Sequence, residues 1–142
     1  MALDARTVVF IITLSTVLIS LGLALVARGP LGQVKAVSHW AYATAVQALG
    51  WIITGLLRGV VPDVLSVVLG NGCIVLSLIF YMAIIAEFLQ QRFSLRYWYL
   101  GLLLLLPTLA YFTSIQNDVA IRTAMISLMF TSIAYRSVML LA

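Results

Sequence analysis

The chain alternates long apolar blocks with short polar connections. The apolar blocks cover residues 7–27, 37–57, 64–88, 97–114 and 119–141. An α-helix of about 20 apolar residues is long enough to cross the roughly 30 Å hydrocarbon layer of a bilayer. Each block is about that long, so the pattern predicts five transmembrane helices.

Composition supports a membrane protein and excludes a water-soluble globule. Of the 142 residues, 64% are hydrophobic and only 8% are charged, and the mean hydropathy is +1.18. A soluble domain is nearer half apolar and a quarter charged. The connections are too short for an extramembrane domain. We therefore expect an all-α, polytopic transmembrane helical bundle that forms a single transmembrane domain over residues 1–142, with no soluble domain.

The ionisable residues exclude several function classes. A single histidine (His39) and a single cysteine (Cys73) cannot build a zinc site or a bis-histidine haem site. The only lysine, Lys35, lies in a connection, and all four acids lie at block ends. No Ser-His or Cys-His pair or phosphate-binding glycine loop occurs. We therefore expect no catalytic residues and no cofactor, and we expect a lipid environment and no nucleic acid as partner.

The charges predict an orientation. Connections one and three and the C-terminal end carry five basic residues, whereas the N-terminus and the other connections carry three, each accompanied by an acid. Basic residues favour the cytoplasmic side. The pattern predicts an outside N-terminus and an inside C-terminus. The five basic residues of the inner side are Arg28, Lys35, Arg92, Arg96 and Arg136.

Small residues one helical turn apart predict the packing. Helices associate in lipid through close backbone approach and interhelical hydrogen bonds. Four blocks carry a stripe of small residues, so we expect these four to form the bundle and the fourth block (97–114) to be peripheral. The stripes are Thr16, Ser20 and Ala24; Ala41, Ala45 and Ala48, with Ala43, Gln47, Gly50 and Thr54 adjoining; Ser66, Gly70, Cys73 and Ser77; and Ala120, Ala124, Ser127 and Thr131.

Local features predict three further details. Two glycines flank Asn71, which indicates a bend or a very close neighbouring helix. Pro107 should kink the fourth block, with Thr108 satisfying the freed backbone groups. Glu87 should form an interfacial ion pair with Arg92.

Polar residues inside a membrane are expensive and mark candidate functional sites. We expect a cup open to the outside, between the second, third and fifth blocks, that holds a small ligand. The candidate ligand-binding residues are Gln47, Arg58, Asp63, Ser66, Asn71, Tyr111, Asp118 and Arg122.

The same residues also allow a purely structural interpretation. Arg122 can pair with Asp118 four residues earlier and extend to the interface. Asn71 can join two helices by a hydrogen bond. Arg58 and Asp63 can serve topology and helix capping.

Several short motifs suggest a family. They are Met1-Ala2-Leu3-Asp4-Ala5-Arg6-Thr7, Leu57-Arg58-Gly59, Pro62-Asp63, Leu65-Ser66-Val67-Val68-Leu69-Gly70-Asn71, Tyr111-Phe112 and Arg122. With them, the whole chain resembles the five-span N-terminal membrane region that precedes GGDEF catalytic domains in bacterial diguanylate cyclases. The resemblance implies a homodimeric sensory domain of the bacterial cytoplasmic (inner) membrane in cyclic-di-GMP signalling, whose last span feeds a cytoplasmic enzyme. No GGDEF motif occurs in these residues, so they carry no cyclase activity of their own.

The sequence therefore predicts a membrane sensory domain for a small anionic or amphipathic ligand. Arg58 and Arg122 would meet its head group, and Asn71 and Gln47 would contact polar groups deeper in the membrane. Two alternatives remain open. In the first alternative the chain is a passive anchor and dimerisation module. In the second it is a small transporter or channel.

Overall fold

A computed structural model describes residues 4–91, 94–116 and 118–141. These residues form five α-helices and one 3-10 helix, and no β-strand. The elements are α1 (Ala5–Arg28), η1 (Pro30–Gln33), α2 (Lys35–Gly55), α3 (Asp63–Phe88), α4 (Arg96–Ser114) and α5 (Val119–Leu141). Each α-helix matches one predicted block with small shifts at its ends, and the all-α class is confirmed.

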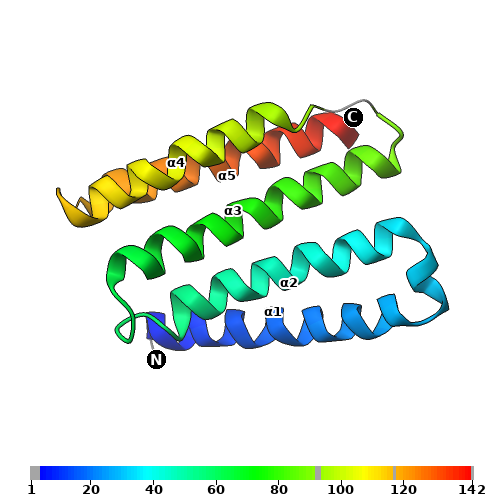
Figure 1. The fold of residues 1–142 in the computed structure, drawn as a ribbon, viewed down its shortest axis with the longest axis horizontal. Coiled ribbons are helices and arrows are strands. Elements are labelled where there is room, and N and C mark those ends of the chain that lie inside the picture. Colours follow the sequence, from blue (N-terminus) through cyan, green and yellow to red (C-terminus); the bar gives the residue numbers. More distant parts are fainter. Residues whose placement is uncertain (1–3, 92–93, 117, 142) are drawn as a thin grey trace.

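Four of these helices are long and apolar enough to cross a membrane. They are α1 from Thr7 onwards, α3, α4 and α5. The membrane class predicted from hydropathy agrees with this result. Over the described residues α2 is not one of the four, although it is 21 residues long and lies beside α1 (Figure 1).

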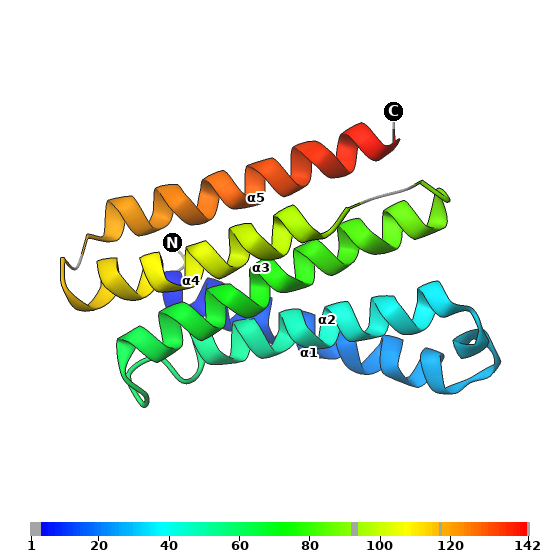
Figure 2. The same cartoon turned by 45° about the horizontal axis from the view of Figure 1, so that its top comes forward.

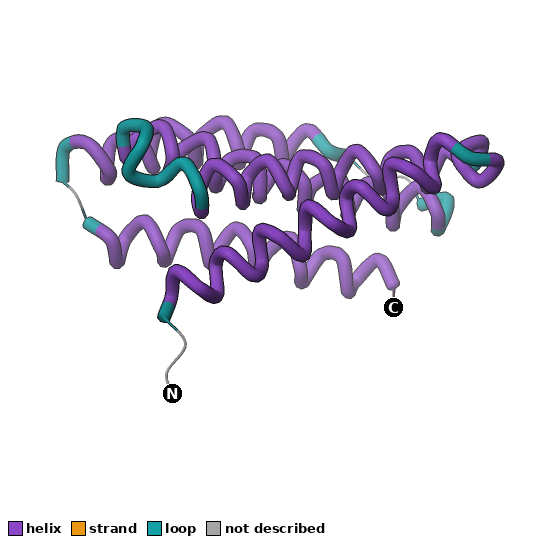
Figure 3. Tube along the Cα trace, turned by 90° about the horizontal axis from the view of Figure 1, so that it is seen from below, coloured by secondary structure: helices purple, strands orange, loops and turns teal. Residues whose placement is uncertain are grey.

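The helices run up and down in sequence order, so the two chain ends lie at opposite ends of the molecule (Figure 1). Helix α3 lies between the α1–α2 pair and the α4–α5 pair (Figure 2). Helix α1 crosses the others at an angle, and its N-terminal end stands away from them (Figure 3). Among the described residues α1 does not contact α3, and α2 does not contact α5.

The expectation that the fourth span is peripheral is wrong. Helix α4 contacts both α3 and α5, and its Leu105 and Leu109 are buried. In the most apolar stretch of each helix, 39% of α3 is buried, 11% of α4 and 6% of α1. The central helix is α3, which contacts α2, α4 and α5, and the edge helix is α1, which contacts only α2 and η1 among the described elements.

A cluster of large side chains joins α3, α4 and α5. We call it the apolar cluster, and its buried members are Val75, Ile79, Met82, Ala86, Leu105, Leu109, Ile133 and Leu140. Interdigitated side chains of this kind gain dispersion energy even where lipid removes the hydrophobic driving force.

On its other side α3 meets α2 through glycines. We call Gly50, Thr54, Gly70 and Ile74 the α2–α3 seam. A Cβ atom at Gly50 would lie 2.9 Å from the carbonyl oxygen of Gly70 and 3.0 Å from the amide nitrogen of Ile74. A Cβ atom at Gly70 would collide with the Thr54 hydroxyl. The two backbones thus approach so closely that only glycine fits.

The two glycines around Asn71 serve different neighbours. Gly70 faces α2, whereas a Cβ atom at Gly72 would lie 2.8 Å from Cδ2 of Leu106 on α4. Helix α3 continues unbroken through both. The predicted close neighbour is therefore confirmed, and there are two of them, one on each side of the central helix.

The small-residue stripes have different outcomes. Ser66, Gly70 and Ser77 are buried on α3, as predicted. On α2, Ala41 and Ala48 are buried but Ala45 is exposed. The α5 stripe is wrong as a contact within the chain, because α5 turns larger side chains towards α3 and α4. All four of its members are exposed: Ala120, Ala124, Ser127 and Thr131.

Helix α4 continues through Pro107. A proline at this position removes the hydrogen bond to the carbonyl group of Leu103. Thr108 was expected to compensate, but its hydroxyl donates to the carbonyl oxygen of Leu104 at 2.7 Å. The expected role of Thr108 is therefore wrong in detail.

Candidate functional site

The predicted cup between the second, third and fifth spans does not form. The connections from α2 to α3 and from α4 to α5, which carry or adjoin most of its residues, do lie at the same end of the molecule (Figure 1). However, α2 and α5 do not touch over the described residues. Helix α3 packs on α2 at Gly70 and on α4 and α5 with other faces, so the candidates fall into separate groups.

The first group lines a cavity of about 650 Å³ between α1, the end of α2 and the start of α3. We call it the Arg58 cavity. Arg58 and Asp63 contribute opposite charges, and apolar side chains of α1 complete the wall. The lining residues are Val9, Phe10, Thr54, Gly55, Leu56, Arg58, Gly59 and Asp63. Its size is in the range of small-molecule sites.

A tight turn presents Arg58. The amide of Val60 donates to the carbonyl oxygen of Leu57 at 3.0 Å, and Gly59 adopts a φ of 90°. This left-handed conformation suits glycine at the third position of a turn. The Leu57-Arg58-Gly59 motif thus has a local structural role, because it forms the turn that places Arg58 in the wall of the cavity.

Asp63 begins α3, where a carboxylate is favoured by the positive end of the helix dipole. Both Asp63 and Arg58 are described residues, and no ion pair joins them. Nearby, the buried Thr54 hydroxyl has no hydrogen-bond partner among the described residues. The cavity therefore holds two oppositely charged side chains that an occupant can engage.

Ser66 and Asn71 do not join this group. The Ser66 hydroxyl is buried and donates to the carbonyl oxygen of Asp63 at 3.0 Å. The Asn71 amide donates to the carbonyl oxygen of Val67, one turn earlier, at 2.7 Å. Both bonds stay within α3, so this hydrogen bond of Asn71 does not join two helices, and the hypothesis that it does is not supported.

The second group lies between α4 and α5. Arg122 is buried, and its Nη1 donates to the hydroxyl of Thr113 at 3.1 Å. Asp118 caps α5, because its Oδ1 accepts from the amides of Ala120 and Ile121 at 2.9 and 3.1 Å. Asn117 lies outside the described residues. Tyr111 packs edge-on against Phe112, with the ring centres 5.2 Å apart.

Gln47 accepts a hydrogen bond that joins α2 to α3. The Tyr81 hydroxyl of α3 donates to its Oε1 atom at 2.8 Å. Sequence reasoning missed Tyr81 as the partner. A signal was available, because a tyrosine in the middle of an apolar block needs a partner for its hydroxyl, and Gln47 is the amide of the preceding block.

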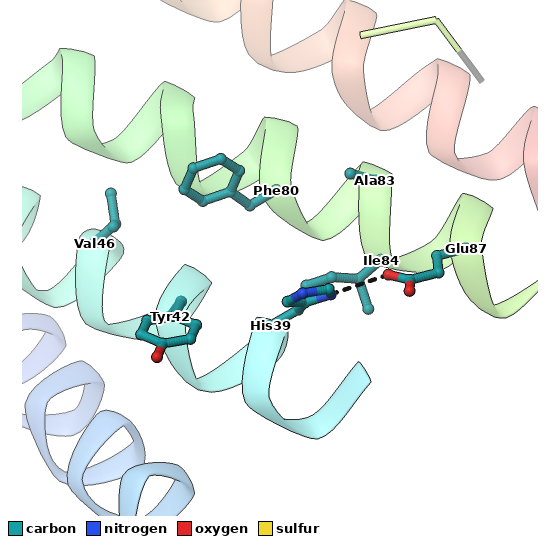
Figure 4. A pocket seen from close by; sticks show the side chains of 7 residues that line it. All are labelled: His39, Tyr42, Val46, Phe80, Ala83, Ile84 and Glu87. Carbon is teal, nitrogen blue, oxygen red and sulfur yellow. Dashed lines mark hydrogen bonds and ion pairs between the residues drawn. The ribbon is translucent and has the colours of Figure 1, made fainter. Parts of the chain in front are cut away.

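Sequence reasoning also missed a groove at the opposite end of the same two helices. We call it the His39–Glu87 groove, and its volume is about 490 Å³. It is lined by His39, Tyr42, Val46, Phe80, Ala83, Ile84 and Glu87 (Figure 4). The sequence does contain a signal for this groove, because its lining residues within each block are three, four or seven positions apart. This spacing places the residues from 39 to 46 on one helix face and those from 80 to 87 on another.

Among the described residues, the partner of Glu87 is His39. Its Oε2 atom lies 3.0 Å from Nδ1 of His39 (Figure 4). The expected partner Arg92 lies outside the described residues. Because His39 and Glu87 are 48 positions apart, only the antiparallel packing of α2 on α3 brings them together.

Comparison of the chain with protein-family models, curated proteins and solved structures finds no match. The resemblance to GGDEF-associated membrane regions therefore remains a prediction that rests on the sequence motifs alone.

Proposed function

We propose that this chain is the membrane input domain of a bacterial signalling protein, of the kind that precedes a diguanylate cyclase domain. All five helices would cross the cytoplasmic membrane, with the N-terminus outside and the C-terminus inside. The direction of the helices supports this topology. Helices α1 and α3 run the same way (Figure 1), so if both cross, the chain must return between them, and α2 is the segment that returns.

We further propose that the domain binds a small anionic or amphipathic molecule in the Arg58 cavity. The observation that carries this proposal is the combination of a cation, a carboxylate and an apolar wall around one volume of about 650 Å³. Arg58 would bind an anionic head group, and Val9 and Phe10 would contact an apolar part. Arg122 is assigned to stabilising α4 on α5 and not to this ligand.

A signal would pass from this cavity through the helix packing. Helix α1 contacts α2 and η1 among the described elements, so an occupant between α1 and the α2–α3 connection would change the α1–α2 contact. Helix α3 touches α2, α4 and α5 and would carry that change across the molecule. Helix α5 ends at the opposite end of the bundle (Figure 2), where an output domain would follow.

Ligand binding is tested with octanoate, an amphipathic carboxylate, on the purified chain in lipid nanodiscs. We expect saturable binding that weakens at least about tenfold in Arg58→Gln, because a charge-assisted hydrogen bond is lost. Arg28→Gln is the matched control, since Arg28 ends α1 at the opposite end of the bundle. Equal octanoate binding in both variants refutes the role of Arg58.

The signalling role is tested by fusing the chain to a diguanylate cyclase domain and inserting one, two or three residues after position 142. Helical rotation of the output domain should change cyclase activity with insertion length. Cyclase activity that is the same at every length refutes signalling through α5.

The second candidate function is a passive anchor and dimerisation module. It is favoured by the exposed small residues of α5 (Ala120, Ala124, Ser127 and Thr131), which suit close approach of a second copy. In that case, replacing residues 1–142 by unrelated dimeric membrane spans would preserve regulation of a fused cyclase. Loss of regulation in the replacement favours the input domain.

A further inference from the structure

The His39–Glu87 groove is separate from the Arg58 cavity and shares no lining residue with it. His39 and Glu87 lie at one end, and Val46 and Phe80 lie at the other (Figure 4). Seven residues separate His39 from Val46, or about 10 Å along a helix. The groove therefore runs along the helices, polar at one end and apolar over the rest of its length.

The depth of the groove matches a lipid molecule. Glu87 is the penultimate residue of α3, one of the helices suited to crossing a membrane. The polar end of the groove therefore lies where the lipid head groups begin, and Val46 and Phe80 lie at the depth of the acyl chains. The His39 and Glu87 side chains are 51% and 49% exposed, so a neighbouring lipid can reach both.

The charges at the polar end have both signs. Glu87 supplies a carboxylate beside the His39 ring. Lys35, the exposed first residue of α2, lies one helical turn before His39 and thus on the same helix face. With Nδ1 of His39 directed to Glu87, Nε2 is the ring nitrogen left for an occupant. A head group that carries both an ammonium and a phosphate supplies an opposite charge for each of these two side chains.

We propose that the His39–Glu87 groove binds one zwitterionic membrane lipid with a primary ammonium, such as a phosphatidylethanolamine. The ammonium donates hydrogen bonds to the Glu87 carboxylate, the phosphate faces Lys35, and one acyl chain lies along Tyr42, Val46 and Phe80. A choline head has no N–H group to donate. A purely anionic head would leave Glu87 without a cationic partner and repel it.

The test is lipid binding to the purified full chain in detergent, measured by native mass spectrometry. Phosphatidylethanolamine, phosphatidylcholine and phosphatidylglycerol with identical acyl chains are compared. We expect phosphatidylethanolamine to bind about tenfold more tightly than the other two, the size expected for a charge-assisted hydrogen bond. Equal affinities, or a preference for phosphatidylglycerol, overturn the proposal.

Three variants locate the site. Glu87→Gln keeps the side-chain shape and should abolish the preference, while Asp4→Asn, which removes a carboxylate before α1 at the other end of the molecule, should retain it. Ala83→Phe fills the groove and should weaken binding of all three lipids. A preference that survives Glu87→Gln, or lipid binding that Ala83→Phe leaves unchanged, overturns the assignment.

A final arm separates a lipid from its free head group. Soluble phosphoethanolamine lacks the acyl chain, so it should not displace bound phosphatidylethanolamine at comparable concentration. Displacement by phosphoethanolamine would show that the head group alone is recognised, and would overturn the role of the apolar groove.

Discussion

The α2–α3 seam and the apolar cluster are two faces of one helix that pack by different means. At the seam, Gly50 and Gly70 bring two backbones together, so that a carbonyl oxygen occupies the place of a side chain. At the cluster, side chains such as Ile79, Met82 and Leu109 fill the space and are fully buried. Helix α3 is central because it has both surfaces. Its glycine surface packs on the backbone of α2, and its surface of large side chains packs on the side chains of α4 and α5.

If the seam depends on backbone approach, adding one methyl group there should have the largest effect. We expect Gly50→Ala to lower the free energy of unfolding by about 3 kcal/mol, because backbone atoms of Gly70 and Ile74 lie within 3.0 Å of the new Cβ atom and cannot rotate away. Unfolding in mixed detergent and dodecyl sulfate measures it. A variant as stable as the parent would show that the seam has room to open.

If the cluster depends on filled volume, removing a side chain should weaken it. We expect Leu109→Ala to cost about 2 kcal/mol, at the lower end for such substitutions, because lipid supplies no hydrophobic driving force and the lost packing contacts remain as the main term. The same unfolding assay measures it, with the exposed Leu104→Ala as control. Equal losses in the two variants would contradict a buried cluster.

The hydrogen bond from Tyr81 to Gln47 is a polar contribution to the α2–α3 contact, beside the His39–Glu87 pair. We expect Tyr81→Phe to cost about 0.6 kcal/mol, the average for interhelical hydrogen bonds in a membrane. A double-mutant cycle with Gln47→Leu isolates the pair. A coupling energy near zero would show that this hydrogen bond does not stabilise the packing of α2 on α3.

Gly72 sharpens the comparison, because it lies two positions from Gly70 but faces the flexible tip of Leu106. Moving Leu106 costs little, and alanine gains about 1 kcal/mol of helix propensity over glycine. We expect Gly72→Ala to change the free energy of unfolding by less than about 1 kcal/mol in either direction. A loss as large as that of Gly50→Ala would mean that α4 packs as rigidly on α3 as α2 does.

Features encoded by local chemistry were predictable from the sequence. The helix ends follow from hydropathy, and the close approach at Gly70 follows from residue type and position. Arg58 and Asp63 were correctly expected to lie near each other, because only a short connection separates them.

Features that depend on which helices touch were not predictable in the same way. The cup failed because it needed α2 beside α5, and the described residues of these helices do not touch. His39 and Glu87 meet only through the register of two antiparallel helices. The α5 stripe had the spacing of a contact face but is exposed. Spacing alone could not show this, because small residues suit contact with a second copy as well as contact within the chain.

The sequence by itself determined the helical membrane class, the helix boundaries and the glycines that permit close packing. Only the tertiary structure decided that α3 is central, that α1 is the edge helix and that the predicted site residues divide into separate groups. The physical reason is the solvent. In lipid both the inward and the outward faces of a helix are apolar, so hydropathy gives the length of each helix but carries no information about which face its neighbours will cover.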